Sequence, residues 1–316
     1  MKTWAVLSLF ASLALAQSSS YGAATPSASA DPMVPTGLST ECQTFIDSFN
    51  KDDSLTTCTK SLISATQNFG PGGSAGSTPT TAEVTSAVNN ICTGSASTAC
   101  PDSLIRGKLG DFYAACSKEL TSDPNNKLRE IYDVLYALTP LKQAICSKSD
   151  SGDYCVLGSA KSVSSGVDLN KVQEALSYAP TDGSSYARRA EAVVAANLTT
   201  FHDNNLPFLL ISGSLDTSAL CTPCTRNILT SYFNYESDVP YAPGLTNSKL
   251  LSGQNALVGN IQEKCGANFL NGAVQAAGGI KSGTLGSNAA PEVNSRFASV
   301  TAVVAGGLTL AIATLL

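Results

Sequence analysis

Ten cysteines constrain this chain more than any other feature, because paired thiols fix which segments of a fold lie together. Their even number favours five disulfide bonds if the chain folds in an oxidising compartment. A zinc site, the alternative, needs two pairs of closely spaced ligands, and only Cys221 and Cys224 have that spacing. The spacings leave the pairing open. The cysteines are Cys42, Cys58, Cys92, Cys100, Cys116, Cys146, Cys155, Cys221, Cys224 and Cys265.

Residues 1–16 have the organisation of a secretory signal peptide. Lys2 precedes an apolar stretch, and an Ala-Leu-Ala triplet at residues 14–16 supplies a cleavage site. The apolar stretch is too short for a membrane anchor, because a helix needs about 20 residues to cross the hydrocarbon core. We therefore predict cleavage after Ala16 and export from the cytoplasm, in agreement with the disulfide prediction.

The C-terminal residues have the organisation of a signal for attachment of a glycosylphosphatidylinositol (GPI) anchor. Small residues at 286–290 precede a short polar spacer and an uncharged apolar tail at 298–316. The spacing favours Asn288 as the attachment residue, with Ser287 as the alternative, and residues 289–316 would be removed. A single-pass helix is the other interpretation, but no lysine or arginine follows the tail to hold it on the cytoplasmic side.

The segments between these two signals differ in composition. Residues 17–38 are rich in serine, threonine, alanine and proline and predict a flexible, O-glycosylated linker, and residues 281–288 predict a short stalk. Residues 39–280 hold all ten cysteines and form the expected ectodomain. The net charge of −5 without a basic cluster argues against a nucleic-acid partner. A single histidine argues against a histidine-rich metal site.

Apolar residues recur every three or four positions through most of the ectodomain, which predicts a mostly α fold. The clearest helix follows Pro101 and ends before a polar turn at 121–126. The next helix covers residues 128–145. A kink or break is expected near Thr139, because Pro140 lacks the amide hydrogen of a helix interior.

The second half of the ectodomain has further helical segments. Asp168 is suited to cap a helix over 169–176, and similar spacing predicts helices over 186–201 and 257–269. The apolar run at 206–211 fits either a buried helical turn or a strand. Sustained alternation of polar and apolar residues, the mark of a half-buried strand, is scarce.

A weak internal repeat suggests two related helical halves. CTKSLISATQNF at 58–69 resembles CTRNILTSYFNY at 224–235, and each predicts a helix held by a cysteine in its first turn. Chance similarity between amphipathic helices is the alternative. A polar joint between the halves would be stapled by Cys146 and Cys155. The possible halves are residues 39–146 and 167–280.

Three short motifs match catalytic patterns without the context that the chemistry needs. The G-x-S-x-G match at 72–76 lies in a Gly/Ser loop rather than between a strand and a helix. The Asp-Thr-Ser triplet at 216–218 is half of an aspartic-protease dyad without a second half, and a helix cap fits better. The C-x-P-C sequence at 221–224 is typical of disulfide exchangers, but structural bridges fit better without a βαβ unit. Thr222 would then cap the helix that begins at Pro223.

The remaining polar residues have structural interpretations. His202 is expected at the surface or at a helix end. Glu130 and Asp133 lie one helical turn apart and are expected to form a solvated face rather than a glycosidase pair. Asn197-Leu198-Thr199 is an N-x-S/T sequon and predicts an N-glycan on Asn197, with an unused sequon as the alternative. We assign no catalytic residue, no metal ligand and no cofactor.

The cysteine framework and its neighbouring residues form a recognisable pattern. Cys42, Phe45 and Phe49 are followed by the segments CTKSLISATQNF, IYDVLYALTPLKQAIC and CTPCTRNIL. This pattern, over residues 39–280, resembles an uncharacterised family of fungal, secreted, cysteine-rich surface proteins with a GPI signal. The resemblance implies a fungal source and placement at the cell surface. It implies no catalytic residue, because the family has no assigned activity.

Together these features favour a non-enzymatic, GPI-anchored protein of the plasma-membrane outer face or cell wall. Its helical ectodomain would serve a structural role or bind a wall glycan or a surface protein. The second hypothesis is a carrier of a small lipid or sterol, because disulfide-tied helices can enclose an apolar cavity that residues 206–211 would line. The third is a wall-modifying enzyme with unrecognised carboxylates.

Overall fold

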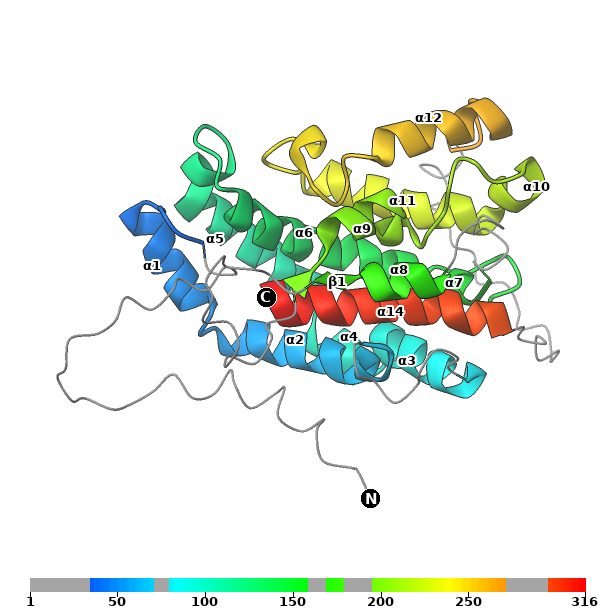
Figure 1. Cartoon of the computed structure of the whole chain (residues 1–316), viewed down its shortest axis with the longest axis horizontal. Coiled ribbons are helices and arrows are strands. Elements are labelled where there is room, and N and C mark those ends of the chain that lie inside the picture. The colour runs from blue at the N-terminus through cyan, green and yellow to red at the C-terminus, as the bar shows by residue number, and fades with distance from the viewer. Residues whose placement is uncertain (1–34, 71–79, 159–168, 179–194, 271–294) are drawn as a thin grey trace, which may run out of the picture.

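The computed structural model describes residues 35–70, 80–158, 169–178, 195–270 and 295–316, which are mostly helical (Figure 1). The predicted fold, a mostly α domain tied by disulfides, is confirmed. The elements are α1 (Thr40–Phe49), α2 (Asp53–Thr66), η1 (Gln67–Phe69), α3 (Thr81–Thr93), α4 (Ser95–Ala99), α5 (Asp102–Leu120), α6 (Asn126–Cys146), α7 (Cys155–Gly158), α8 (Leu169–Ala175), β1 (Ser177–Tyr178), β2 (Ala195–Ala196), α9 (Leu198–Asp203), η3 (Leu206–Phe208), α10 (Thr217–Leu220), α11 (Pro223–Asp238), η4 (Leu245–Asn247), α12 (Gln254–Cys265) and α14 (Ser295–Leu315).

Several predicted features lie outside the described residues. They are the signal peptide, the linker up to residue 34, the G-x-S-x-G match at 72–76, Asp168, the stalk at 281–288, and the attachment residues Asn288 and Ser287. These predictions are therefore untested by the structure.

Local capping sets the boundaries of the first helices. The Asp52 side chain accepts a hydrogen bond from the Leu55 amide at 2.9 Å and begins α2. A capping box between Thr80 and Glu83 begins α3. Pro101 stands at the N-cap of α5, one position before the helix. The predicted turn after Leu120 is confirmed.

Helix α6 lies at the centre of the described fold and packs against α3, α5 and α11. It continues as one helix through Pro140, so of the kink or break expected near Thr139, the break is wrong. Residues on both sides of the proline, including Leu138 and Leu141, are buried. Their packing stabilises the helical path and offsets the hydrogen bond that proline cannot donate.

All ten cysteines are paired, which confirms the prediction of five disulfides. The bonds tie α1 to α5, α2 to the end of α4, α3 to α6, α7 to α11, and the end of α10 to α12. The predicted staple between Cys146 and Cys155 is wrong, because each bonds to a cysteine far away in sequence. The pairs are Cys42–Cys116, Cys58–Cys100, Cys92–Cys146, Cys155–Cys224 and Cys221–Cys265.

The second half differs from the periodicity prediction in two places. Ala195 and Ala196 form β2, which pairs antiparallel with β1, so the expected helix over 186–201 does not cover them. Helix α9 begins only at Leu198; residues 186–194 are not described. Helix α12 ends at Cys265, because Gly266 takes a φ of 89° that a helix cannot continue, and Phe269 lies beyond it.

The two segments of the internal repeat are both helical but differ in their ties. Cys224 lies in the first turn of α11, whereas Cys58 lies in the second turn of α2. Cys58 bonds forward in sequence to Cys100, and Cys224 bonds back to Cys155. The shared first-turn tie is therefore wrong, and the duplication stays a prediction.

The C-terminal apolar tail forms α14, which runs through the middle of the helical assembly (Figure 1, red). It contacts α2, α3, α6, α7, α8, β2, η1 and η3. Side chains around its whole circumference are buried, including Val303, Leu308 and Ile312, which expose 2%, 4% and 1% of their surface. An apolar helix without a polar face is stabilised in this setting, because every side that it would otherwise expose to water is buried.

None of the helices within the described ranges combines the length and the apolar character needed to cross a membrane.

Candidate functional site

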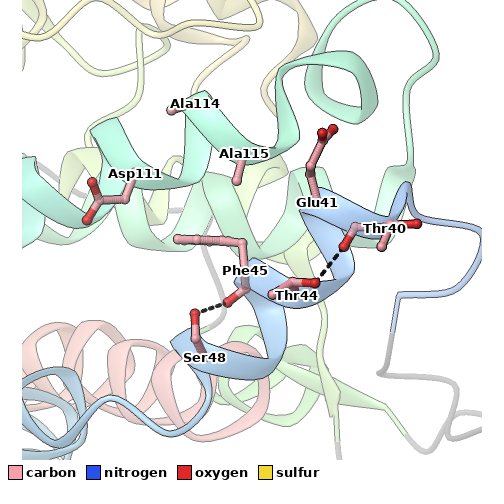
Figure 2. Close-up of a pocket in the computed structure, with 8 residues that line it drawn as sticks. All are labelled: Thr40, Glu41, Thr44, Phe45, Ser48, Asp111, Ala114 and Ala115. Atoms are coloured by element: carbon pink, nitrogen blue, oxygen red, sulfur yellow. Dashed lines mark hydrogen bonds between the residues drawn. The ribbon is translucent and has the colours of Figure 1, made fainter.

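A groove of about 690 Å³ runs between α1 and α5 (Figure 2). Helix α1 contributes five side chains at helical spacing, and α5 contributes Asp111, Ala114 and Ala115. The two alanines leave the groove open, because their methyl groups reach only a short way from the α5 backbone. The side chains from α1 are Thr40, Glu41, Thr44, Phe45 and Ser48.

The two walls of this groove are fixed relative to each other. The Cys42–Cys116 disulfide joins them with a Cα–Cα distance of 4.7 Å. Beneath it, the Phe45 ring packs on Phe112 with ring centroids 5.1 Å apart. The amide of Ser39, which caps α1, donates to the buried Glu119 carboxylate of α5 at 2.7 Å. The groove therefore presents a preformed surface.

The polar lining of the groove consists of hydroxyls and carboxylates around one aromatic ring. Figure 2 shows Glu41 and Asp111 at opposite ends, with the Phe45 ring between them. The Thr44 and Ser48 hydroxyls donate to backbone carbonyls of their own helix at 2.8 and 2.7 Å. The hydroxyl oxygens still have lone pairs for an incoming donor. A half-buried ring flanked by hydroxyls and carboxylates can take up a polar, hydroxyl-rich partner.

Asp133 on α6 corrects one sequence interpretation. The solvated face expected for Glu130 and Asp133 is wrong for Asp133, which is fully buried. Its carboxylate accepts hydrogen bonds from the Tyr241 hydroxyl and from the Lys249 amide, the latter at 2.6 Å. Both donors belong to the segment after α11, so the reason for the burial is a tertiary contact that helical spacing does not show.

The surroundings of Asp133 set its titration and its role. Burial raises the pKa of Asp133 to about 6, although hydrogen bonds from Tyr241, Ser248 and backbone amides act in the opposite direction. Glu130, one turn away, forms ion pairs with Lys127 at 2.8 Å and Lys249 at 2.6 Å. Both carboxylates thus hold Lys249 against α6, Asp133 through the backbone amide and Glu130 through the side-chain ammonium group.

Two of the three motifs that match catalytic patterns, at 216–218 and at 221–224, lie at the starts of helices, as expected. Asp216 stands at the N-cap of α10. Thr222 caps α11 by accepting from the Thr225 amide at 3.2 Å, and Pro223 is the first helical residue. Cys221 and Cys224 bond to different partners, so the C-x-P-C sequence closes no disulfide of its own.

The single histidine and the sequon lie at the two ends of α9. His202, in the last turn, pairs its Nδ1 with the Asp203 carboxylate at 2.9 Å. Asn197 caps the start by accepting the Thr200 amide on its Oδ1 at 3.3 Å. A glycan would attach to the Nδ2 atom of Asn197, so glycosylation and capping are compatible.

The second candidate site is the space that α14 occupies between α2, α3, α6, α7, α8, β2, η1 and η3, which we call the seat of α14. A Cβ added at Gly307 would lie 2.9 Å from a methyl carbon of Leu206. The backbone of α14 therefore packs directly against the Leu206 side chain of η3 at this position. On the opposite side, the Thr309 hydroxyl donates to the Thr66 hydroxyl of α2. Ala305 belongs to a small apolar cluster with residues of η1 and α3, namely Phe69, Val84 and Ala87.

The apolar run at 206–211 forms part of that seat. It contains the 3₁₀ turn η3, followed by Leu209 and Leu210 with φ values of 52° and 62°. Such left-handed values are unfavourable for a branched residue, so packing must hold the segment. The Pro207 carbonyl accepts the hydroxyl of buried Tyr232, which ties the run to α11. Of the two alternatives for this run, a helical turn or a strand, the structure has the helical turn, over Leu206–Phe208.

Sequence reasoning missed the α1–α5 groove, because the contacts that bring these helices together, such as the Cys42–Cys116 bond, join residues far apart in sequence. It also missed the burial of Asp133 and the seat of α14. Among the described residues, no cluster of three or more His, Cys, Asp or Glu side chains is placed to hold a metal ion.

No family model, no curated protein and no solved structure matches this chain.

Proposed function

We propose that this protein is a GPI-anchored cell-surface protein whose helical ectodomain binds a partner outside the plasma membrane through the α1–α5 groove. The observation that supports an exported protein is the pairing of all ten cysteines. Disulfides persist in oxidising compartments and are rare in reducing ones. The two apolar end segments supply the expected export and anchoring signals.

The partner is expected to be hydroxyl-rich, as a cell-wall glycan is. The groove offers one half-buried aromatic ring, three hydroxyls and two carboxylates on walls joined by a disulfide. This lining supports hydrogen bonding to a polymer that lies along the surface.

The anchoring part of the proposal has a direct test in peptide mapping. Trypsin cuts after Lys281 and Arg296, so an uncleaved chain yields the peptide of residues 282–296. We expect membrane-derived protein to lack this peptide and to yield residues 282–288 carrying the anchor remnant on Asn288. Substitution of Ser287, Asn288 and Ala290 by glutamine, which is too large for the attachment site and adds no trypsin site, should restore the longer peptide. Recovery of the 282–296 peptide from wild-type mature protein would contradict the anchor.

The binding part of the proposal has a matched pair of variants. Asp111→Lys changes the charge inside the groove, and Asp123→Lys makes the same change in the exposed turn after α5. We expect the first to weaken retention of the ectodomain on isolated wall glycans at least tenfold, and the second to leave it unchanged. Equal retention of both variants would contradict the groove. Hydrolysis of the glycan, lost on changing one carboxylate, would contradict a non-enzymatic role.

A further inference from the structure

We infer that removal of the tail converts the seat of α14 into a binding site for an uncharged lipid alcohol, the chemistry of a free sterol. This inference rests on the proposed GPI processing, which would remove residues 289–316. The seat is the space that α2, α3, α6, α7, α8, β2, η1 and η3 leave around α14.

The length of the seat matches membrane lipids. The residues from Thr301 to Ile312 are buried wherever the structure describes their side chains. Twelve residues at about 1.5 Å each give a slot roughly 18 Å long. One leaflet of a bilayer has about half of the roughly 30 Å hydrocarbon thickness. The slot therefore has the length of a lipid that occupies a single leaflet, and a protein anchored at the membrane surface is close to such lipids.

The walls of the seat are apolar but carry one unsatisfied acceptor once the tail leaves. Phe69, Phe201 and Leu206 face α14 with hydrocarbon surface. The Thr66 hydroxyl is fully buried, donates to the Leu62 carbonyl at 2.8 Å and accepts from Thr309. Loss of Thr309 leaves the Thr66 oxygen on the wall of the slot without its partner from α14, so its lone pair can accept a hydrogen bond from a ligand hydroxyl.

This chemistry distinguishes between lipid classes. A ligand hydroxyl can donate to Thr66 as Thr309 does, whereas an ionised carboxylate has no proton to donate. No wall residue named above carries a positive charge that would offset a buried anion, and burial of an unpaired charge is strongly unfavourable. The occupant is therefore a neutral lipid with a hydroxyl group.

The disulfides favour a slot that persists when the tail is gone. Cys58–Cys100 ties α2 to the end of α4, Cys92–Cys146 ties α3 to α6, and Cys155–Cys224 ties α7 to α11. None of the five bonds involves α14, which contains no cysteine. Four walls of the seat thus keep covalent ties that tail removal leaves intact.

The test compares the naturally processed protein with the Ser287→Gln/Asn288→Gln/Ala290→Gln chain, which keeps its tail and gains no trypsin site. Both are titrated with the fluorescent sterol dehydroergosterol, and tryptic mapping reports whether the 282–296 peptide is present. We expect saturable binding of one sterol by the processed form and none by the tailed form, whose slot is filled. The fluorescent fatty acid cis-parinaric acid should bind the processed form at least tenfold more weakly at pH 8.

Variants of the processed protein locate the site. Thr66→Val removes the acceptor at nearly constant volume and should weaken sterol binding about tenfold, the effect of one hydrogen bond. Thr57→Val, on the exposed side of the same helix, is the control and should have no effect. Leu206→Trp should abolish binding by filling the slot, which provides a second test if the first variant folds poorly.

The outcomes separate this inference from the anchor proposal. Processed protein that lacks the tail and binds no sterol would overturn the inference and leave the anchor intact. Mature protein that retains the tail would overturn both, because α14 then fills the slot permanently. Equal binding of the fatty acid, or wild-type affinity of both Thr66→Val and Leu206→Trp, would overturn the assignment of the site.

Discussion

Asp52 combines two stabilising roles in one side chain. Its carboxylate caps α2 and pairs with Lys108 of α5, and both side chains expose 22% of their surface. Hydrogen bonds from Lys108, Ser54 and the Leu55 amide hold the pKa of Asp52 well below its usual range. A lowered pKa in the folded state means that the stabilisation is present above the unfolded value, near pH 4, and is lost as the pH falls.

We expect Asp52→Ala to lower the free energy of unfolding at pH 7 by about 1–2 kcal/mol, the usual effect of losing a cap. Asp52→Asn should lose less, because its amide oxygen still caps the helix. Urea unfolding at pH 7 and pH 3 measures both effects, and the difference from wild type should shrink at pH 3. Asp47→Ala, in the exposed part of α1, is the control. A difference that is independent of pH would contradict the role of the charge.

For Asp133 we expect the free energy of unfolding to depend on pH in the opposite direction to that for Asp52. Its pKa of about 6 lies above the unfolded value of 3.8, so the folded state binds more protons between these pH values. Its contribution to the free energy of unfolding is fully present below about pH 4 and is lost as the pH rises to 6, by roughly 3 kcal/mol. We expect Asp133→Asn to remove this loss, as measured by urea unfolding at pH 4 and pH 7.

The control for Asp133 is Glu130→Gln, one turn away on the same helix. It breaks the ion pair with Lys249 and leaves the buried carboxyl group in place. An unchanged pH profile in Asp133→Asn, with Glu130→Gln also unchanged, would show that the buried carboxyl does not titrate in this window.

At the scale of elements, the space around a glycine shows how closely a helix packs against its neighbours. Gly307 of α14 meets Leu206, whereas a Cβ at Gly107 of α5 would meet nothing within 4 Å. A side chain at position 307 must displace packed atoms. A side chain at position 107 has free space around it and stabilises the helix, because it restricts the unfolded backbone more than glycine does.

In the chain that keeps its tail, we therefore expect Gly307→Val to lower the free energy of unfolding by about 1–3 kcal/mol, the usual effect of overpacking. Gly107→Ala should raise it by about 0.5–1 kcal/mol. Thermal unfolding of the full-length chain with its attachment residues substituted measures both. An unchanged midpoint for Gly307→Val would show that α14 does not occupy its seat. In the anchored protein the same substitution should have no effect, because the tail is absent.

At the scale of the whole molecule, the disulfides join elements distant in sequence into one framework. The bonds span from 42 to 74 residues of sequence. Closing such loops typically adds 2–4 kcal/mol each, mainly by restricting the unfolded chain.

We expect the unreduced protein to weigh ten hydrogens less than the reduced protein, two for each of the five bonds. Peptide mapping without reduction should recover Cys92 joined to Cys146, and Cys155 joined to Cys224. A peptide joining Cys146 to Cys155 would contradict the fold, because it would release α7 from α11. Mapping after reduction and alkylation is the control.

The sequence by itself determined the features that depend on neighbours along the chain. Apolar spacing located α5 and α6, Thr222 and Pro223 marked the start of α11, and the count of cysteines predicted five bonds. These features follow from short-range rules of periodicity, capping and composition. The same rules failed at Pro140, where packing on both sides keeps the helix intact.

Only the tertiary structure decided which cysteines pair, that Asp133 is buried, and that α1 and α5 enclose a groove. Each depends on contacts between residues that are tens to more than a hundred positions apart, which local patterns do not encode. The apolar tail shows the division most clearly. Its composition requires that it leave water, either by removal or by burial, and the fold alone supplies the seat between α2 and η3 that α14 occupies.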